Sequence, residues 1–317
     1  MAKSPDYCNS TTAMMMTEAI DSQVLRGQLR LRILSLYNQA HAGHIGCSLS
    51  CIDLMIATLI LHKRPQDTFL LSKGHAAAAL YACLNYLGDI SDDELATFYL
   101  NGTTLPAHPA PNKHRDIPFA TGSLGHGLPI GAGIAHAGKL LGDDCESTPG
   151  ESTAPAGRPA RVYVLMSDGE TNEGTTWEAA HFAVQHKLDN LIVLVDKNGL
   201  QGFGNTADVF GDTADIRTWE AIGFETVEVD GHDIDAILAT LDGFQTGAAG
   251  LGKPKMVIAR TVKGKGVSYM ENRLEWHYLP MTPAQYEQAC ADVSAEWNTD
   301  LTAPADRDCT DQKRIFL

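Results

Sequence analysis

Two short apolar runs, each followed at once by polar residues, constrain the fold of this chain most. Residues 161–166 lead into Asp168, and residues 190–195 lead into Asn198. Apolar runs of this length are typical of strands that are buried on both faces of a sheet. The segment between them, from Thr175 to about Leu188, has the pattern of a capped helix. Strand, helix and strand in this order predict a parallel sheet, because parallel neighbours need such a crossover.

The rest of the chain continues this alternation. Further strands are predicted near residues 67–72, 225–229 and 255–261, and further helices at about residues 17–40, 49–61, 76–88 and 233–241, with another opened by the Gly-rich turn at 121–127. We therefore expect an α/β fold, a parallel sheet with helices on both faces. Ligands of such folds bind beyond the carboxyl ends of the strands.

Composition suggests how the chain is organised around this sheet. Residues 1–16 are expected to be a disordered extension, and residues 17–284 one domain. Residues 143–160, rich in Pro, Gly and Ser, predict a surface insertion. Residues 101–120 predict a long ordered loop, of the kind that is often functional. Residues 285–317 are expected to form a tail with at most a short helix.

The helix predicted at residues 49–61 is apolar on almost every side. Ser48 or Ser50 is its expected N-cap. A helix without a polar face should be buried, either inside this chain or inside an assembly.

Charge and cysteine usage limit the kinds of partner and compartment. The chain has 24 Lys and Arg against 39 Asp and Glu, a net charge of −15, which argues against nucleic acid or an anionic membrane as the main partner. A small phosphorylated ligand is compatible with this charge, because backbone N–H groups and a metal ion can hold it. We find no apolar run long enough for a membrane span and no secretory signal. The seven scattered cysteines favour reduced thiols in the cytoplasm.

The polar residues at the two strand ends have the chemistry of a metal site. Asp168 and Asn198 supply oxygen ligands, which Mg²⁺ prefers together with water and phosphate oxygens. Gly169 allows close approach of the backbone, and the helix that begins near Thr175 points its N-terminus to the same place. These features predict a site for a metal and a diphosphate.

The segment 167–174, followed by Asn198 at a distance of 30 residues from Asp168, resembles the fingerprint of thiamine diphosphate-dependent enzymes. That fingerprint is Gly-Asp-Gly followed at this distance by Asn. The resemblance implies that Asp168, Asn198 and the carbonyl of Leu200 ligate Mg²⁺. Ser167 replaces the first Gly, for which we expect a slightly altered turn and a retained site.

Further motifs follow the order seen in transketolases, over roughly residues 17–280. The last of them is especially similar to the N-terminal subunit of transketolases that are split into two chains. The motifs are Ala42–Gly46, Leu71–His75, Ala107–Pro109, Thr121–Gly127, the metal motif, and Lys263–Asn272 with Trp276-His277.

This resemblance implies a set of residues that contact the cofactor. His126 departs from the family, since many transketolases have Gln there, and its side-chain role stays open. Glu173 matches an acidic family position near the dimer interface, with a solvated loop carboxylate as the alternative. The implied contacts are His75, Gly125, His126, Gly127, Gly169, Glu170, Glu173 and Asn198.

Four histidines, His44, His75, His108 and His277, are implied to line the channel for cofactor and substrate. Imidazole binds sugar hydroxyls and relays protons near neutral pH. A hydrogen-bonded structural role is the alternative for any one of them. For Lys263 and Lys265 we favour a role in ordering their glycine-rich loop.

The resemblance also implies a partner. Full-length transketolases have a second domain with the Glu that acts on the aminopyrimidine ring and with most substrate-phosphate contacts. This sequence ends 40 residues after His277, so we expect a C-terminal transketolase subunit to supply that domain, in an α2β2 assembly. The pair would pass a two-carbon ketol unit from a ketose or ketose phosphate to an aldose.

Two other interpretations stay open from the sequence. One is a different thiamine enzyme, such as the alpha subunit of a 2-oxoacid dehydrogenase or a deoxyxylulose-phosphate-type synthase, which would share the Asp and Asn fingerprint. The other is a non-catalytic assembly subunit that has kept the fold.

Overall fold

The computed structural model describes residues 22–141, 160–246 and 252–299. The predicted extension at residues 1–16 and nearly all of the insertion at 143–160 lie outside the described residues, as does the predicted tail from residue 300 onwards.

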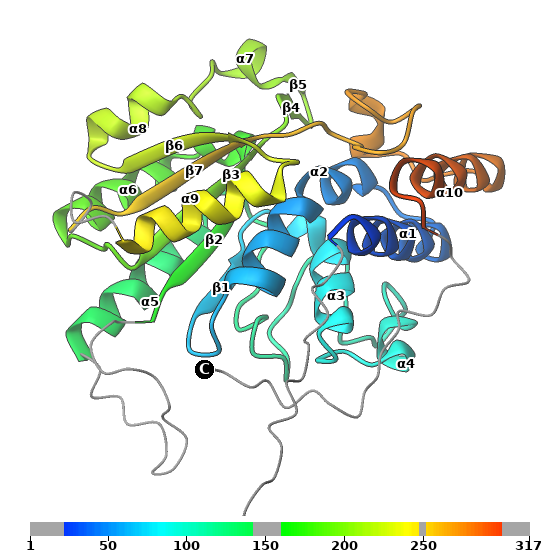
Figure 1. Cartoon of the computed structure of the whole chain (residues 1–317), viewed down its shortest axis with the longest axis horizontal. Coiled ribbons are helices and arrows are strands. Elements are labelled where there is room, and N and C mark those ends of the chain that lie inside the picture. The colour runs from blue at the N-terminus through cyan, green and yellow to red at the C-terminus, as the bar shows by residue number, and fades with distance from the viewer. Residues whose placement is uncertain (1–21, 142–159, 247–251, 300–317) are drawn as a thin grey trace, which may run out of the picture.

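A five-stranded, wholly parallel sheet forms the centre of the molecule (Figure 1). This confirms the parallel sheet predicted from the apolar runs. Strands β2 and β3 are neighbours, with Ser167 paired to Asp196 at their carboxyl ends. In spatial order the strands are β1 (Thr68–Leu71), β2 (Val162–Ser167), β3 (Leu191–Lys197), β7 (Lys255–Arg260) and β6 (Glu225–Asp230).

Alternate side chains of β1, β2, β3 and β7 enter two separate hydrophobic cores, one on each face of the sheet. On β2, Val162 and Val164 belong to one core, whereas Tyr163 and Leu165 belong to the other. Helices cover both faces, as predicted (Figure 1). On the Val162 side are α5 (Gly127–Leu141), α6 (Gly174–Gln185) and α8 (Ile216–Ile222), and on the Tyr163 side are α1 (Ser22–Ala40), α2 (Ile45–Met55), α3 (Ala77–Tyr86), α9 (Ile234–Thr246) and α10 (Pro283–Trp297).

The connections contribute short elements. Residues 101–120 contain no helix or strand, in agreement with the predicted loop. The short elements are α4 (Asp92–Leu95), α7 (Thr206–Val209), the hairpin β4 (Leu200–Gln201) and β5 (Gly204–Asn205), a π-helical turn (Ile56–His62), and 3₁₀ turns at Gly74–Ala76, Asp168–Asn172 and Leu274–His277.

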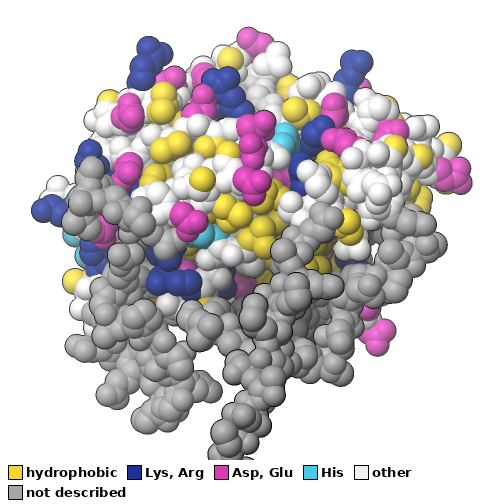
Figure 2. Space-filling model, viewed as in Figure 1, with side chains coloured by type: hydrophobic (Ala, Val, Ile, Leu, Met, Phe, Trp, Pro, Cys, Tyr) yellow, Lys and Arg dark blue, Asp and Glu magenta, His cyan; other side chains and the backbone are white. Residues whose placement is uncertain are grey.

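On the face shown in Figure 2, acidic and basic side chains are interspersed among apolar ones.

The apolar helix begins earlier than predicted. Helix α2 starts at Ile45, and its N-cap is His44 in the left-handed region (φ 74°), so the predicted cap at Ser48 or Ser50 is wrong. Both serines lie inside the helix, where Ser48 bonds the hydroxyl of Tyr37 and Ser50 donates to Asp196. Both serine hydroxyls therefore bond side chains from other elements and do not cap the helix.

Contrary to our expectation, the stretch Ile45–His62 has the length and hydropathy of a membrane span, with 18 residues of mean hydropathy 1.8. Of this stretch, 83% is buried inside the fold. Every residue of α2 is buried by other parts of this chain. This burial within one chain explains the apolar composition, which is that of a core helix.

The segment after residue 282 also differs from the expected tail. Thr282 and Gln285 form a reciprocal capping box at the start of α10, which has 15 residues. Ala289, Val293 and Trp297 follow at four-residue intervals and are buried in the same core as α1. Residues 283–297 therefore pack as part of the domain.

Helix α6 likewise begins at Gly174 with Glu173 as its N-cap, not at the predicted Thr175. Thr175 donates to the carbonyl of Gly125, and Thr176 donates to the carbonyl of Glu170. Both hydroxyls tie the helix to the preceding turns, and neither caps it.

Candidate functional site

The tips of β2 and β3 bring the two predicted metal-binding side chains together. Asp168 is 1% exposed, and its carboxylate accepts hydrogen bonds from the N–H groups of Gly199 (2.8 Å) and Gly169 (2.9 Å). The amide oxygen of Asn198 accepts from the N–H of Leu200 at 3.1 Å. Since Gly199 directly follows Asn198, its bond to Asp168 holds the two strand tips against each other.

A cavity of about 440 Å³ opens at these strand ends. It gathers residues from segments that are far apart in the sequence, as expected for the carboxyl edge of a parallel sheet. The predicted site residues that line it are His44, His75, His108, Asp168, Gly169, Glu173, Asn198, Leu200 and His277.

Four predicted cofactor contacts do not line this cavity. Gly125 and Gly127 are buried, and a Cβ on Gly127 would collide with Ser72. His126 is exposed and turns its Nδ1 towards the carbonyl of Leu124. Instead, Gly122 and Leu124 of the same turn reach the cavity.

Glu170, the fourth of these residues, is fully buried. Its carboxylate accepts from the N–H groups of Ser167 (2.9 Å) and Gly125 (3.0 Å) and from the hydroxyl of Ser72. Its side chain therefore does not line the cavity. Burial raises the pKa of Glu170, although these donors oppose the rise. The residue joins the Gly-rich turn to the tip of β2.

The Glu170→Gln variant should lower the free energy of unfolding by about 1–3 kcal/mol, because the amide NH₂ would face buried donors in place of an acceptor. Chemical denaturation of both proteins measures the change. Glu173→Gln, three residues away and exposed, serves as the control and should unfold like the parent. Equal stability of all three proteins would contradict the role of Glu170 in joining the Gly-rich turn to β2.

The four predicted histidines form one cluster. The ring centre of His44 lies 5.2 Å from that of His277, 5.6 Å from that of His75 and 5.8 Å from that of His108. Burial, followed by neighbouring positive charge, lowers the pKa of His44 and His277 to about 4, and burial lowers that of His75 to about 4. Neutral imidazoles can each donate one hydrogen bond and accept another.

Lys263 is a site residue that the sequence interpretation missed, since we expected it to order a loop. Its side chain is fully buried and lines the cavity, with Nζ 3.2 Å from the carbonyl oxygen of Leu200 and 2.9 Å from Nδ1 of His277. Within the described part of the chain, no carboxylate forms an ion pair with it. A buried ammonium without a counter-ion is costly, so an anion in the cavity would stabilise it.

Cys47 is the second residue that was missed. Its thiol lines the cavity, and Sγ lies 3.7 Å from Nδ1 of His277. Burial by itself would raise the pKa of this thiol, but Lys263 and His75 outweigh burial and lower the pKa to about 6. The sequence offered one signal for Cys47: it lies about one helical turn after His44, a predicted site residue.

The strand tips fit a hard divalent cation. Burial, with the nearby Asp196 as the second cause, raises the pKa of Asp168 to about 6, so a cation at the strand tips would stabilise its charged form. Asp168, Asn198 and the carbonyl of Leu200 together offer only oxygen donors, as Mg²⁺ prefers. In the described ranges no group of three or more His, Cys, Asp or Glu is arranged to hold a metal ion, so phosphate or water oxygens would have to complete the shell.

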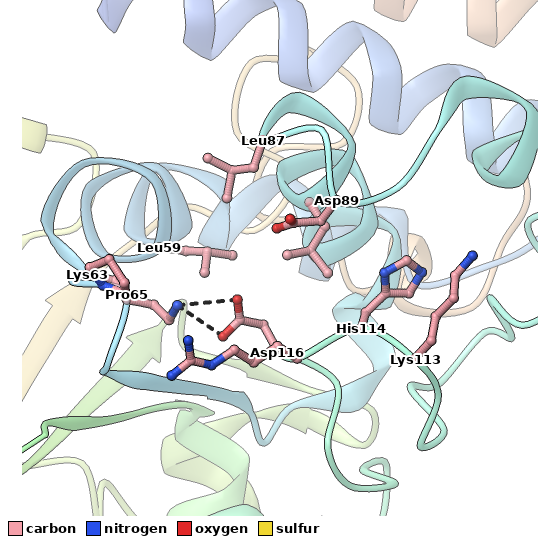
Figure 3. A pocket seen from close by; sticks show the side chains of 10 residues that line it. Leu59, Lys63, Pro65, Leu87, Asp89, Lys113, His114 and Asp116 are labelled. Atoms are coloured by element: carbon pink, nitrogen blue, oxygen red, sulfur yellow. Dashed lines mark hydrogen bonds and ion pairs between the residues drawn. The ribbon is translucent and has the colours of Figure 1, made fainter. Parts of the chain in front are cut away.

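A second cavity, of about 680 Å³, lies near the start of β1 (Figure 3). An ion pair between Lys63 and Asp116 (3.2 Å) spans its wall, and Leu59 and Leu87 contribute apolar surface. None of the predicted site residues lines it. The cavity at the carboxyl edge of the sheet is therefore the candidate site.

A match to a known family model shows to which family this chain belongs. Residues 22–312 match the family model described as transketolase, thiamine diphosphate binding domain. The chain belongs to this transketolase family. Its thiamine diphosphate binding domain thus includes α10, which the sequence interpretation had left outside.

Several relatives of this transketolase domain are named as transketolase subunits, and two of them are compared below. The chain is 37% identical to an apulose-4-phosphate transketolase subunit from Actinobacillus succinogenes, over 82% of this chain and 90% of the relative. It is 31% identical to the 6-deoxy-6-sulfo-D-fructose transketolase subunit SqwG of a Clostridium species, over 89% of this chain and 99% of the relative. These alignments span nearly the whole of both relatives.

Solved transketolases share the fold. The structure from Leishmania mexicana aligns with a TM-score of 0.76 at 26% identity, over 90% of this chain and 42% of that one. The structure from Campylobacter jejuni aligns with a TM-score of 0.72 at 28% identity, over 89% of this chain and 43% of that one. The chain therefore spans less than half the length of these transketolases.

Proposed function

We propose that this chain is the N-terminal subunit of a two-chain transketolase, which transfers a two-carbon ketol unit from a ketose to an aldose. The observation that carries the proposal is one cavity in which the Asp168 and Asn198 strand tips meet four histidines. The names of the two subunit relatives described above support it. Because those names specify a sugar phosphate and a sulfonated sugar, we propose a sugar with an anionic terminal group as the substrate.

Asp168, Asn198 and the carbonyl of Leu200 would hold Mg²⁺, and with it the diphosphate of the cofactor. Lys263 would add a positive charge beside the same anion. When bound, thiamine diphosphate supplies an electron sink for the two-carbon carbanion. The neutral histidines would bind sugar oxygens and pass protons between them, as their spacing and lowered pKa values allow.

We also propose that a partner subunit docks over the mouth of the cavity. Large apolar side chains are exposed there, among them Phe203 (88%), Phe210 (69%) and Tyr278 (55%), and each of these lines the cavity. Val209 and Leu279 extend this apolar rim. Exposed aromatic residues that surround a site mark an interface. The occupant we propose is a C-terminal subunit with the pyrimidine-binding domain and the catalytic Glu, in a cytoplasmic α2β2 complex.

A donor assay tests the proposed reaction against another thiamine enzyme. The chain is combined with the partner, sought first in the neighbouring reading frame, and supplied with thiamine diphosphate, Mg²⁺ and an aldose acceptor. Ketose phosphates and sulfonated ketoses should act as donors, and pyruvate should not. Turnover of pyruvate alone would contradict the proposal. Cofactor binding without turnover of any donor would favour the non-catalytic interpretation.

A further inference from the structure

The hydrogen bond between Lys263 and His277 indicates which ring nitrogen of His277 carries the proton. Nζ of Lys263 lies 2.9 Å from Nδ1 of His277. A lysine ammonium has three N–H donors and no acceptor, so the ring nitrogen must accept. A histidine nitrogen accepts only when it carries no proton. The proton of neutral His277 must then reside on the other nitrogen, Nε2.

We propose that Lys263 is a positioning residue that holds His277 in a single tautomer, with its ring proton on Nε2 and directed at the cavity.

The opposite edge of the ring agrees with this assignment. Nε2 of His277 lies 3.6 Å from the point that a Cβ on Gly202 would occupy, and Gly202 belongs to the cavity wall. The backbone of His277 is held in place, since its carbonyl accepts from the N–H of His44 at 3.1 Å. The Nε2 proton is thus presented at the cavity wall.

Burial and two lysines favour the neutral form of His277. Burial lowers the pKa of the ring first, and the positive charges of Lys263 and Lys73 lower it further. His44 and His75 lie 5.2 and 5.7 Å away between ring centres, and burial is the largest cause that lowers the pKa of each to about 4. Sγ of Cys47 lies 3.7 Å from Nδ1, but Lys263 and His75 outweigh burial and lower the pKa of this thiol to about 6, so at neutral pH it is mostly ionised and Lys263 is the donor to Nδ1.

A fixed Nε2–H makes His277 a hydrogen-bond donor at that atom, never an acceptor. It would therefore bind an oxygen of the substrate with a free lone pair, such as the ketose carbonyl. This consequence for substrate rests on the proposed function, whereas the tautomer itself does not.

The test uses the full-length chain labelled with ¹⁵N at histidine, without cofactor or partner. The tautomer is read from the ¹⁵N chemical shifts and the ring couplings, and the His277 signals are assigned with His277→Gln. In the parent protein at neutral pH we expect a protonated Nε2 and an unprotonated Nδ1. A protonated Nδ1 in the parent would overturn the proposal, whatever the variants do.

The Lys263→Met variant keeps the aliphatic stem but removes the donor. We expect His277 to become a mixture of tautomers and its pKa to rise, because a nearby positive charge is lost. Lys263→Arg, which also only donates, should restore the Nε2–H form. Lys265→Met is the matched control two residues away. Lys265 pairs with Glu271 and Glu296, so the His277 spectrum of this variant should equal that of the parent. An unchanged His277 spectrum in folded Lys263→Met would contradict the role of Lys263.

Failure of this proposal is distinguishable from failure of the proposed function. The spectra need no turnover and no cofactor, so they decide the tautomer even if the chain transfers no ketol unit. Conversely, an active enzyme with His277 protonated on Nδ1 would refute only the role of Lys263.

Discussion

The Asp168→Asn variant should lose at least about 100-fold in affinity for thiamine diphosphate in the presence of Mg²⁺, since loss of mere outer-shell partners of a metal already costs about 10- to 100-fold. The substitution keeps the shape of the side chain and one acceptor oxygen for the N–H of Gly199. It removes the negative charge that the strand tips offer to a cation. Calorimetric titration of the two-subunit complex with the cofactor, with and without Mg²⁺, measures the loss.

Asp208→Asn is the matched control for this change. Asp208 is an exposed carboxylate on α7 that accepts from Asn205. Its removal alters the net charge by the same amount near the same end of the molecule, so the affinity should equal that of the parent. Circular dichroism confirms that both variants fold. Tight Mg²⁺-dependent binding by folded Asp168→Asn would remove Asp168 from the metal site.

The second large effect should come from the partner. The chain by itself should show no ketol transfer, and activity should appear as the partner subunit is titrated in. Phe203→Ser together with Phe210→Ser should raise the partner concentration needed for half-maximal activity by about 10-fold or more, since truncation of a buried aromatic anchor typically costs more than about 1 kcal/mol. Enzyme assay and sedimentation of the mixed subunits give the two readouts.

Leu100→Ser provides the comparison for these substitutions. Leu100 is 59% exposed and follows α4, which lies far from β4 and β5 in Figure 1. Its loss should leave association unchanged. Full activity of the isolated chain would refute the need for a partner, and unaltered association of the Phe203 and Phe210 double variant would refute the apolar rim as its docking surface.

The sequence predicted the parts of the site that depend on local pattern. Buried strands such as β2 and β3 leave an apolar run in the sequence, and a parallel sheet places their carboxyl ends at one edge. Asp168 and Asn198 could therefore be placed together from the strand pattern alone. The four histidines were found by resemblance, because nothing in their spacing reveals that residues 44 and 277 meet.

What the sequence did not reveal depends on contacts between distant segments. Glu170 turns inward because Ser72 and Gly125 offer donors there, and neither partner is near it in sequence. Lys263 enters the cavity because the loop after β7 folds against Leu200. Helix α2 starts at Ile45 without a side-chain cap, so the usual capping signal was absent. In each case tertiary packing, which leaves no periodic signal, decides the outcome.

The location of the metal in crystals of the two-subunit complex with thiamine diphosphate and Mn²⁺ is the most direct test. Anomalous scattering at the manganese edge identifies the ion by its element. The expected result is one peak bound by the side chains of Asp168 and Asn198, the carbonyl of Leu200 and the diphosphate. A peak away from these strand tips, or a cofactor bound elsewhere in the complex, would contradict the site.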